Sequence, residues 1–149
     1  MRDAFGGTFM IKLGLIFLVV YVSFMAVAIN YAKAFRVKNQ VINIIEQYKY
    51  NGETTGIAID EINSYLAGVP YNFGNNDEVK ETCANISGDD DNYIFTQNGA
   101  CIIPKGTMGN FGNSSRYYKV ITFIDIDFNF FDIHLTVPIS GETKVIYIN

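Results

Sequence analysis

The sequence predicts an α+β protein in which a long N-terminal helix, transmembrane in its first half, packs on a C-terminal antiparallel β-sheet. Residues 13–29 contain no charged side chain, and all of them except Ser23 are apolar or glycine. Apolar residues then recur at steps of three and four as far as Tyr48, as in an amphipathic helix. The C-terminal part is rich in valine, isoleucine and aromatic residues, which favour strands. Because the helical stripe and one sheet face both need burial, we expect two layers that cover each other.

The apolar segment is long enough to cross a membrane. From Phe9 to Ile29 a helix extends roughly 30 Å, which is the thickness of a bilayer core. A cleavable signal peptide has a shorter apolar core of about 7–15 residues. We therefore expect an uncleaved anchor, although Ala32 and Ala34 leave a cleavage site open. Lys12 lies near the start of the segment, where its long side chain can reach the near interface.

One continuous helix is expected from about Thr8 to Tyr50, with Asn51-Gly52 as its stop signal. A second, short helix is expected after Thr54-Thr55, with Gly68 and Pro70 at its end. The residues from Pro70 to Glu81 are expected to form a turn-rich connection. The predicted organisation is a short N-terminal segment (1–7), a transmembrane half-helix (8–34), an amphipathic half-helix (35–52) and an extracytoplasmic globular domain (53–149).

The remainder of the chain predicts antiparallel strands. Asn98-Gly99 is a strong hairpin signal, and the segments on either side of it are expected to pair. A loop is expected from Pro104 to Ser115. Pro138 should kink a strand or place it at an edge, and Gly141 is a candidate bulge. The expected strands are 92–97, 100–103, 117–127, 133–137 and 142–148.

The two cysteines, Cys83 and Cys101, indicate one disulfide in an oxidising compartment. Such a bond would close a loop of about twenty residues and stabilise the domain by roughly 3 kcal/mol. The alternative is two unpaired thiols. The cysteines favour a domain outside the cytoplasm, whereas the positive charges that follow the apolar segment (Lys33, Arg36 and Lys38) favour a cytoplasmic C-terminus.

The composition argues against several functions. A net charge of −4 without a basic cluster makes nucleic acid an unlikely partner. We predict that the protein is not an enzyme, since His134 is the only histidine and no phosphate-binding or zinc-protease motif occurs. The acidic residues Asp125, Asp127 and Asp132 are interpreted as a solvated strand end rather than a catalytic pair.

One acidic run is a candidate metal site. Asp89, Asp90 and Asp91 follow Gly88 and precede Asn92, and their carboxylates are ligands that Ca²⁺ prefers. The alternating spacing of an EF-hand loop is missing. We therefore expect no resident cofactor, with Ca²⁺ as the one candidate and a solvated acidic turn as the alternative.

Two blocks of the sequence resemble type IV pilin-like proteins, and most closely the tight-adherence (TadE-like) pseudopilins and small pilin-like membrane proteins of Gram-positive bacteria. Residues 6–52 are similar in layout to the anchor of these proteins, and residues 117–147 to their final strand pair. In type IV pilins a glycine precedes the cleavage point and a glutamate is the fifth mature residue. Cleavage between Gly7 and Thr8 would instead make Lys12 the fifth residue.

The resemblance implies a structural subunit that assembles through its hydrophobic helix into a pilus or an envelope-spanning secretion filament. Its implied partners are the membrane, copies of itself or other pilin-like subunits, and the assembly machinery. Charged substitutions at Val19 or Val27, within the helix, are expected to block assembly. The alternative is a signal-anchored single-pass membrane protein whose extracytoplasmic domain binds a ligand or a partner.

Overall fold

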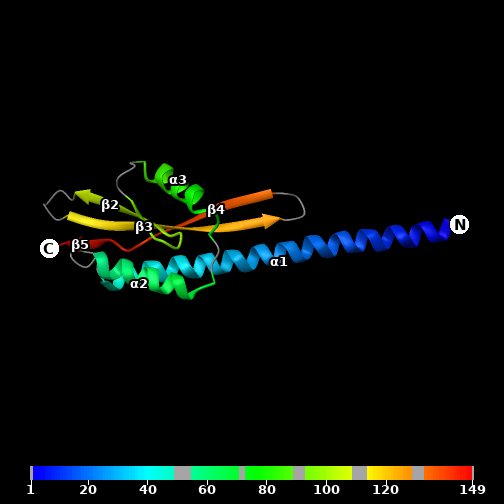
Figure 1. Ribbon diagram of the computed structural model, residues 1–149, viewed down its shortest axis with the longest axis horizontal. Coiled ribbons are helices and arrows are strands. Elements are labelled where there is room, and N and C mark those ends of the chain that lie inside the picture. The colour runs from blue at the N-terminus through cyan, green and yellow to red at the C-terminus, as the bar shows by residue number, and fades with distance from the viewer. Residues whose placement is uncertain are drawn as a thin grey trace.

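The computed structural model describes residues 2–48, 55–70, 73–88, 93–108, 114–128 and 133–148. It has a mixed α+β layout in which an antiparallel sheet lies between helices on both faces (Figure 1). Helices α1 and α2 cover one face and α3 lies over the other, so the fold has three layers and the prediction of two was wrong. The elements are α1 (Arg2–Tyr48), α2 (Thr55–Gly68), α3 (Asn76–Ser87), β1 (Ile94–Phe95), β2 (Cys101–Met108), β3 (Ser114–Phe128), β4 (Ile133–Glu142) and β5 (Ile146–Ile148).

Helix α1 is the longest element and extends far beyond the rest of the domain (Figure 1). It begins at Arg2 rather than at Thr8, because Gly6 and Gly7 weaken a helix by only about 1 kcal/mol each and do not interrupt it. Its expected stop at Asn51-Gly52 lies outside the described residues. Helix α2 confirms the predicted second helix.

The apolar stripe of α1 packs against the sheet, as expected. The stripe begins at Ala34, and its buried residues are Ala34, Val37, Val41, Ile44 and Ile45. From α2, Ala58, Ile62 and Leu66 join the same core.

The middle of the central strand β3 is buried on both faces. Tyr118 and Val120 point into the core beneath α1 and α2, whereas Ile121 and Phe123 point into the core beneath α3. Successive side chains of a strand point to opposite faces, so a run that is continuously apolar predicts burial on both sides. The run from Val120 to Ile124, which is apolar except for Thr122, carried that signal for a third layer.

Helix α3 occupies a segment where a turn-rich connection was expected. Asn75 caps it by accepting a hydrogen bond from the Asp77 backbone N–H at 3.2 Å, and Gly88 ends it in the left-handed region with φ +75°. Val79 and Cys83 are buried one turn apart against the sheet. The short helix has only this narrow apolar stripe, and that is why the polar composition concealed it.

The hairpin of β1 and β2 turns at Gly99, as predicted, although with a longer loop. Phe95 pairs with Cys101, and the Thr96 N–H donates to Ala100 O at 2.9 Å. Three residues therefore form the loop, and its last, Gly99, adopts the left-handed region with φ +79°.

The predicted loop from Pro104 to Ser115 was wrong at both ends, because β2 continues to Met108 and β3 begins at Ser114. Pro104 is tolerated within β2 since β1 pairs only as far as Ile102. Beyond that residue no other described strand pairs with this edge of β2, and at such an edge a strand can lack a backbone donor.

The strand β4 runs through Pro138 on the outer edge of the sheet, pairing it with Phe123. Gly141 is in register with Val120, so it is not the predicted bulge. The irregularity comes just after it: between the pairs Lys119–Glu142 and Arg116–Ile146, β3 has two residues and the opposite edge has three. The single extra residue separates β4 from β5 on the same side of β3.

Candidate functional site

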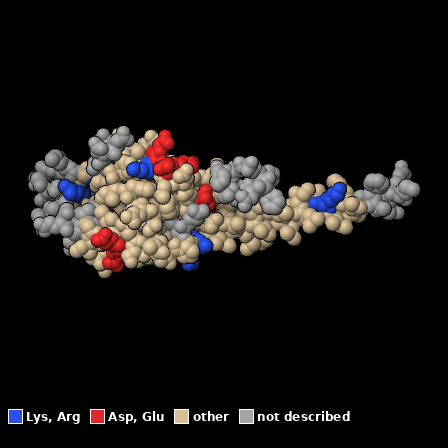
Figure 2. Space-filling view, viewed as in Figure 1, with Lys and Arg blue, Asp and Glu red and all other residues tan. Residues whose placement is uncertain are grey.

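The most prominent surface is the membrane-length half of α1, which the rest of the described chain leaves uncovered. Figure 2 shows it as a narrow projection whose described surface is neutral except for one basic patch. By length and composition this is a helix that can span a membrane, and one 18-residue stretch of it has a mean hydropathy of 2.3. Its exposed apolar side chains include Phe9, Ile16, Phe17, Phe24 and Ile29, each more than half exposed. Only lipid or another protein can remove so much apolar surface from water.

The residues predicted to govern insertion and assembly all lie on this half. Lys12 is exposed and is the only charged residue between Asp3 and Lys33. Val19 is 44 % exposed, whereas Val27 is less exposed than most of its neighbours. Gly7 and Thr8, the candidate processing position, lie in the continuous helix and are exposed.

Helix α1 begins to pack against the sheet at Ala34, which is fully buried. The Thr122 hydroxyl donates to the Ala34 carbonyl oxygen at 3.3 Å. Ile124 and Ile139 pack around the same residue. Thr122 was not singled out from the sequence, and the only signal was a threonine within the otherwise apolar run from Val120 to Ile124.

A close approach between α1 and the sheet follows immediately. A Cβ at Gly141 would lie 2.9 Å from both Lys38 Cδ and Ile42 Cδ1, so a glycine allows the helix to approach β4 closely. Lys38 is 8 % exposed, and its ammonium lies 4.2 Å from the centroid of the Phe35 ring. The lysine stem thus packs on the sheet while its charge faces an aromatic ring.

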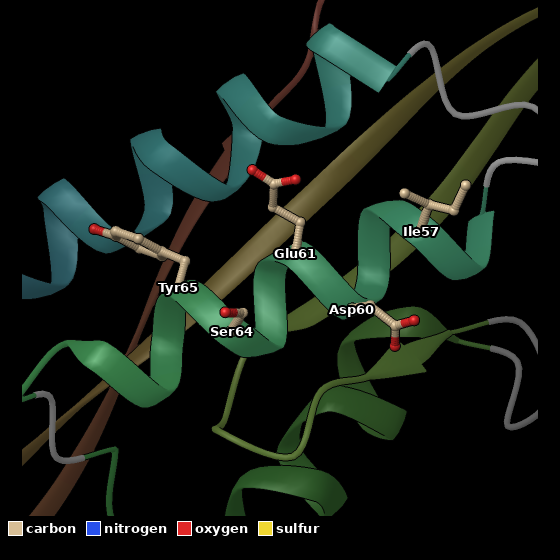
Figure 3. A pocket seen from close by; sticks show the side chains of 5 residues that line it. All are labelled: Ile57, Asp60, Glu61, Ser64 and Tyr65. Carbon is tan, nitrogen blue, oxygen red and sulfur yellow. The ribbon is translucent and has the colours of Figure 1, made fainter.

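The end of α1 contacts α2 beside a shallow, open pocket of about 420 Å³ (Figure 3). Its lining residues all belong to α2 and are Ile57, Asp60, Glu61, Ser64 and Tyr65. Glu61 and Tyr65 point toward α1, and the Glu61 carboxylate accepts a hydrogen bond from the Tyr48 hydroxyl. That bond, together with the negative charge of Glu61, raises the pKa of Tyr48 above its ordinary value. A side-chain hydrogen bond thus joins the end of α1 to α2.

The opposite face of the sheet is held by the predicted disulfide. Cys83 of α3 and Cys101 of β2 are bonded, with their Cα atoms 6.0 Å apart, and both are fully buried. The Lys105 ammonium donates to the Ser87 carbonyl oxygen, near the C-terminus of α3, at 3.5 Å. A covalent bond therefore holds a helix that buries little apolar surface of its own. A persistent disulfide is typical of an oxidising compartment.

The remaining predicted residues are only partly placed. Asp89, Asp90, Asp91 and Asp132 lie outside the described residues. Over the described ranges, no three metal-ligating acids, cysteines or histidines come together. Asp127 and His134 occupy paired positions on β3 and β4.

No known protein family, no curated protein and no solved structure matches this chain.

Proposed function

We propose that this protein is a pilin-like structural subunit that assembles through the uncovered half of α1 into a pilus or an envelope-spanning filament. One observation carries the proposal: a single helix is uncovered over its membrane-length half and seated on a sheet over the other half. A simple tether needs no such rigid continuity. A filament subunit does, because the helix must fix the orientation of its domain relative to its neighbours.

In this function α1 has two successive environments. Lipid covers Phe9 to Ile29 before assembly, and the same surface then packs against helices of other copies. Since lipid chains are as apolar as the helix, assembly depends on close side-chain packing and on interhelical polar contacts rather than on the hydrophobic effect alone. The disulfide favours a domain outside the cytoplasm.

Lys12 gives the proposal a specific electrostatic requirement. A lysine in an apolar helix bundle needs an acidic partner or a route to water. In an uncleaved chain, Asp3 of a neighbouring copy can supply the acid. Cleavage between Gly7 and Thr8 would remove it, so the proposal favours an uncleaved subunit.

Charge substitutions in α1 test this function. Val19→Asp and Val27→Asp should abolish fibres that can be sheared from cells and pelleted. Val145→Asp is the matched control, because it makes the same change at a 49 % exposed valine of the globular domain and should leave the fibres intact. Val19→Leu, which keeps the helix apolar, should also assemble.

Membrane fractionation separates assembly from insertion, since a charge at the helix centre costs about 3 kcal/mol on insertion. A variant that remains in the membrane but forms no fibres supports the proposal. If the unsubstituted protein is found only as a detergent-soluble monomer, the filament function is wrong. The protein is then a single-pass anchored protein whose domain binds a ligand or a partner.

A further inference from the structure

The end of the β3–β4 hairpin runs past the point where α1 leaves the sheet. In Figure 1 this end of the hairpin overlaps the N-terminal half of α1 along the long axis of the molecule. At the Ala34 level, Thr122 contacts the helix. From Thr122 the strand continues to Phe128, a further rise of roughly 20 Å at 3.3 Å per residue.

Three contacts fix the alignment of α1 with the sheet. The Lys144 N–H donates to Glu46 Oε1 at 2.9 Å, Gly141 lies against Lys38, and Thr122 lies against Ala34. As β3 is followed toward Phe128, the helix residues in contact with the sheet come successively closer to the N-terminus of α1. The strand and the helix therefore run in opposite directions. At about 1.5 Å per helical residue, the hairpin overlaps at most about thirteen residues before Ala34. Ile29, where the apolar segment ends, is five residues before Ala34 and so lies within this range.

The face of the hairpin on the α1 side is apolar and lacks a full cover. Ile124 packs on Ala34, and Ile126 continues along the same face. Their cross-strand partners are Val137 and Leu135, which remain 40 % and 49 % exposed. These four residues form what we call the hairpin face.

The opposite side of the hairpin is different in character. Asp125 and Thr136 pair there and lie against Gly74, in the segment before α3. The hairpin is thus amphipathic at the level where α1 becomes uncovered. This arrangement matches a boundary between lipid and water.

The charges and aromatic residues of α1 place that boundary independently. A bilayer core of about 30 Å accommodates Phe9 to Ile29. Just beyond it, Tyr31 is 54 % exposed, and Lys33 and Arg36 are exposed cations. Tyrosine and basic residues are favoured at the head-group layer of a membrane.

We propose that the hairpin face rests in the interfacial layer of the membrane that α1 spans, with Leu135 and Val137 in contact with phospholipid. The domain then has a second point of attachment to the bilayer, which restricts its tilt around α1. Because β4 is an edge strand, its unpaired backbone groups must stay near the head groups, so the contact is shallow. The proposal rests on α1 as a membrane span and not on filament formation.

Tryptophan fluorescence can test this contact, since the chain contains no tryptophan. Leu135→Trp and Val137→Trp would each be made in the full-length protein and reconstituted in phosphatidylcholine vesicles with brominated acyl chains. Val145→Trp, 49 % exposed on the segment between β4 and β5, is the control that should face water. We expect a blue-shifted emission and a loss of fluorescence at positions 135 and 137 but not at 145. Bromine near the head group should quench more than bromine near the chain end.

Two outcomes would overturn the proposal. If the emission at positions 135 and 137 is neither blue-shifted nor quenched, as expected at position 145, the hairpin face lies in water. A blue shift without quenching, reversed by diluting the protein in lipid, would show that a second copy covers the face. Retention of the Cys83–Cys101 disulfide and of the far-ultraviolet circular dichroism spectrum shows that each variant is folded. Because the readout needs no fibres, its failure and the failure of the proposed function are separable.

Discussion

The two halves of α1 form one continuous helix but differ in composition and in surroundings. From Gly6 to Lys33 the helix is almost entirely exposed, whereas from Ala34 onward a stripe of its side chains is fully buried. The first half is apolar on all sides and the second on one side only. A helix that is apolar all round belongs in lipid or a protein interior, and an amphipathic one belongs on a domain. The difference shows that the domain itself stabilises one half and leaves the other to an external partner.

The sharpest contrast should come from the same substitution in each half. Val41→Asp places a carboxylate at a fully buried position and should destabilise the domain by about 4 kcal/mol. Val19→Asp, at a 44 % exposed position, should leave the domain fold intact. Urea unfolding of the full chain in a mild detergent, followed by near-ultraviolet circular dichroism, measures both. A similar loss of stability in the two variants would mean that the first half also supports the domain.

A second test compares the two faces of the sheet. One face is held by burial beneath α1, and the other depends on the bond between Cys83 and Cys101. Replacing both cysteines with serine should lower the free energy of unfolding by roughly 3 kcal/mol. The reduced form of the unsubstituted protein is the control and should show a comparable loss. An unchanged urea midpoint would show that packing alone holds α3.

Alanine substitutions at two glycines test how tightly each face of the sheet is packed. A Cβ at Gly99 would lie 2.2 Å from Phe73 Cγ, and its φ of +79° also disfavours a side chain, so Gly99→Ala should cost about 2 kcal/mol. Gly141→Ala meets only flexible ends of Lys38 and Ile42 and should cost about 1 kcal/mol. Thermal melts of the two variants rank them. A larger loss of stability for Gly141→Ala than for Gly99→Ala would mean that the contact between α1 and β4 is the more tightly packed of the two.

The smallest effect concerns pH and the core beneath α1. Burial raises the pKa of Tyr118 above its ordinary value of 10.0, although Arg116 opposes the shift. The folded state therefore favours the neutral phenol. Its contribution to stability is complete below pH 10 and is lost as the pH rises through the raised folded-state pKa. Tyr118→Phe should reduce this loss of stability at alkaline pH. Tyr117 is the adjacent residue on the other face of β3, and Tyr117→Phe should leave the loss unchanged.

Sequence reasoning predicted the continuous helix because its signal extends over many turns. It also predicted the disulfide, since only two cysteines exist. It missed α3, because twelve mostly polar residues give a weak periodic signal and the stabilising contacts come from the sheet. It misplaced the irregularity at Gly141, since a glycine that admits a helix and one that forms a bulge look alike in sequence.

The candidate site was only partly accessible to the same reasoning. Lys12 was identified from hydropathy and from the resemblance to pilins, and Val19 and Val27 from the assembly that the resemblance implies. Ala34 contacts Thr122, a residue far away in the chain, so no local pattern could reveal this contact. The hairpin face likewise depends on strand register, which joins Ile126 to Leu135 only after folding.

The most direct test of the division in α1 is to remove its first half. A chain of residues 29–149 retains Ala34 and every buried residue of the α1 stripe. We expect this chain to be a soluble monomer by light scattering, with amide exchange in β3 as slow as in the full-length protein in detergent. The full-length protein should need detergent, lipid or assembly to remain in solution. A truncated chain that unfolds, or whose β3 amides exchange much faster, would contradict the account.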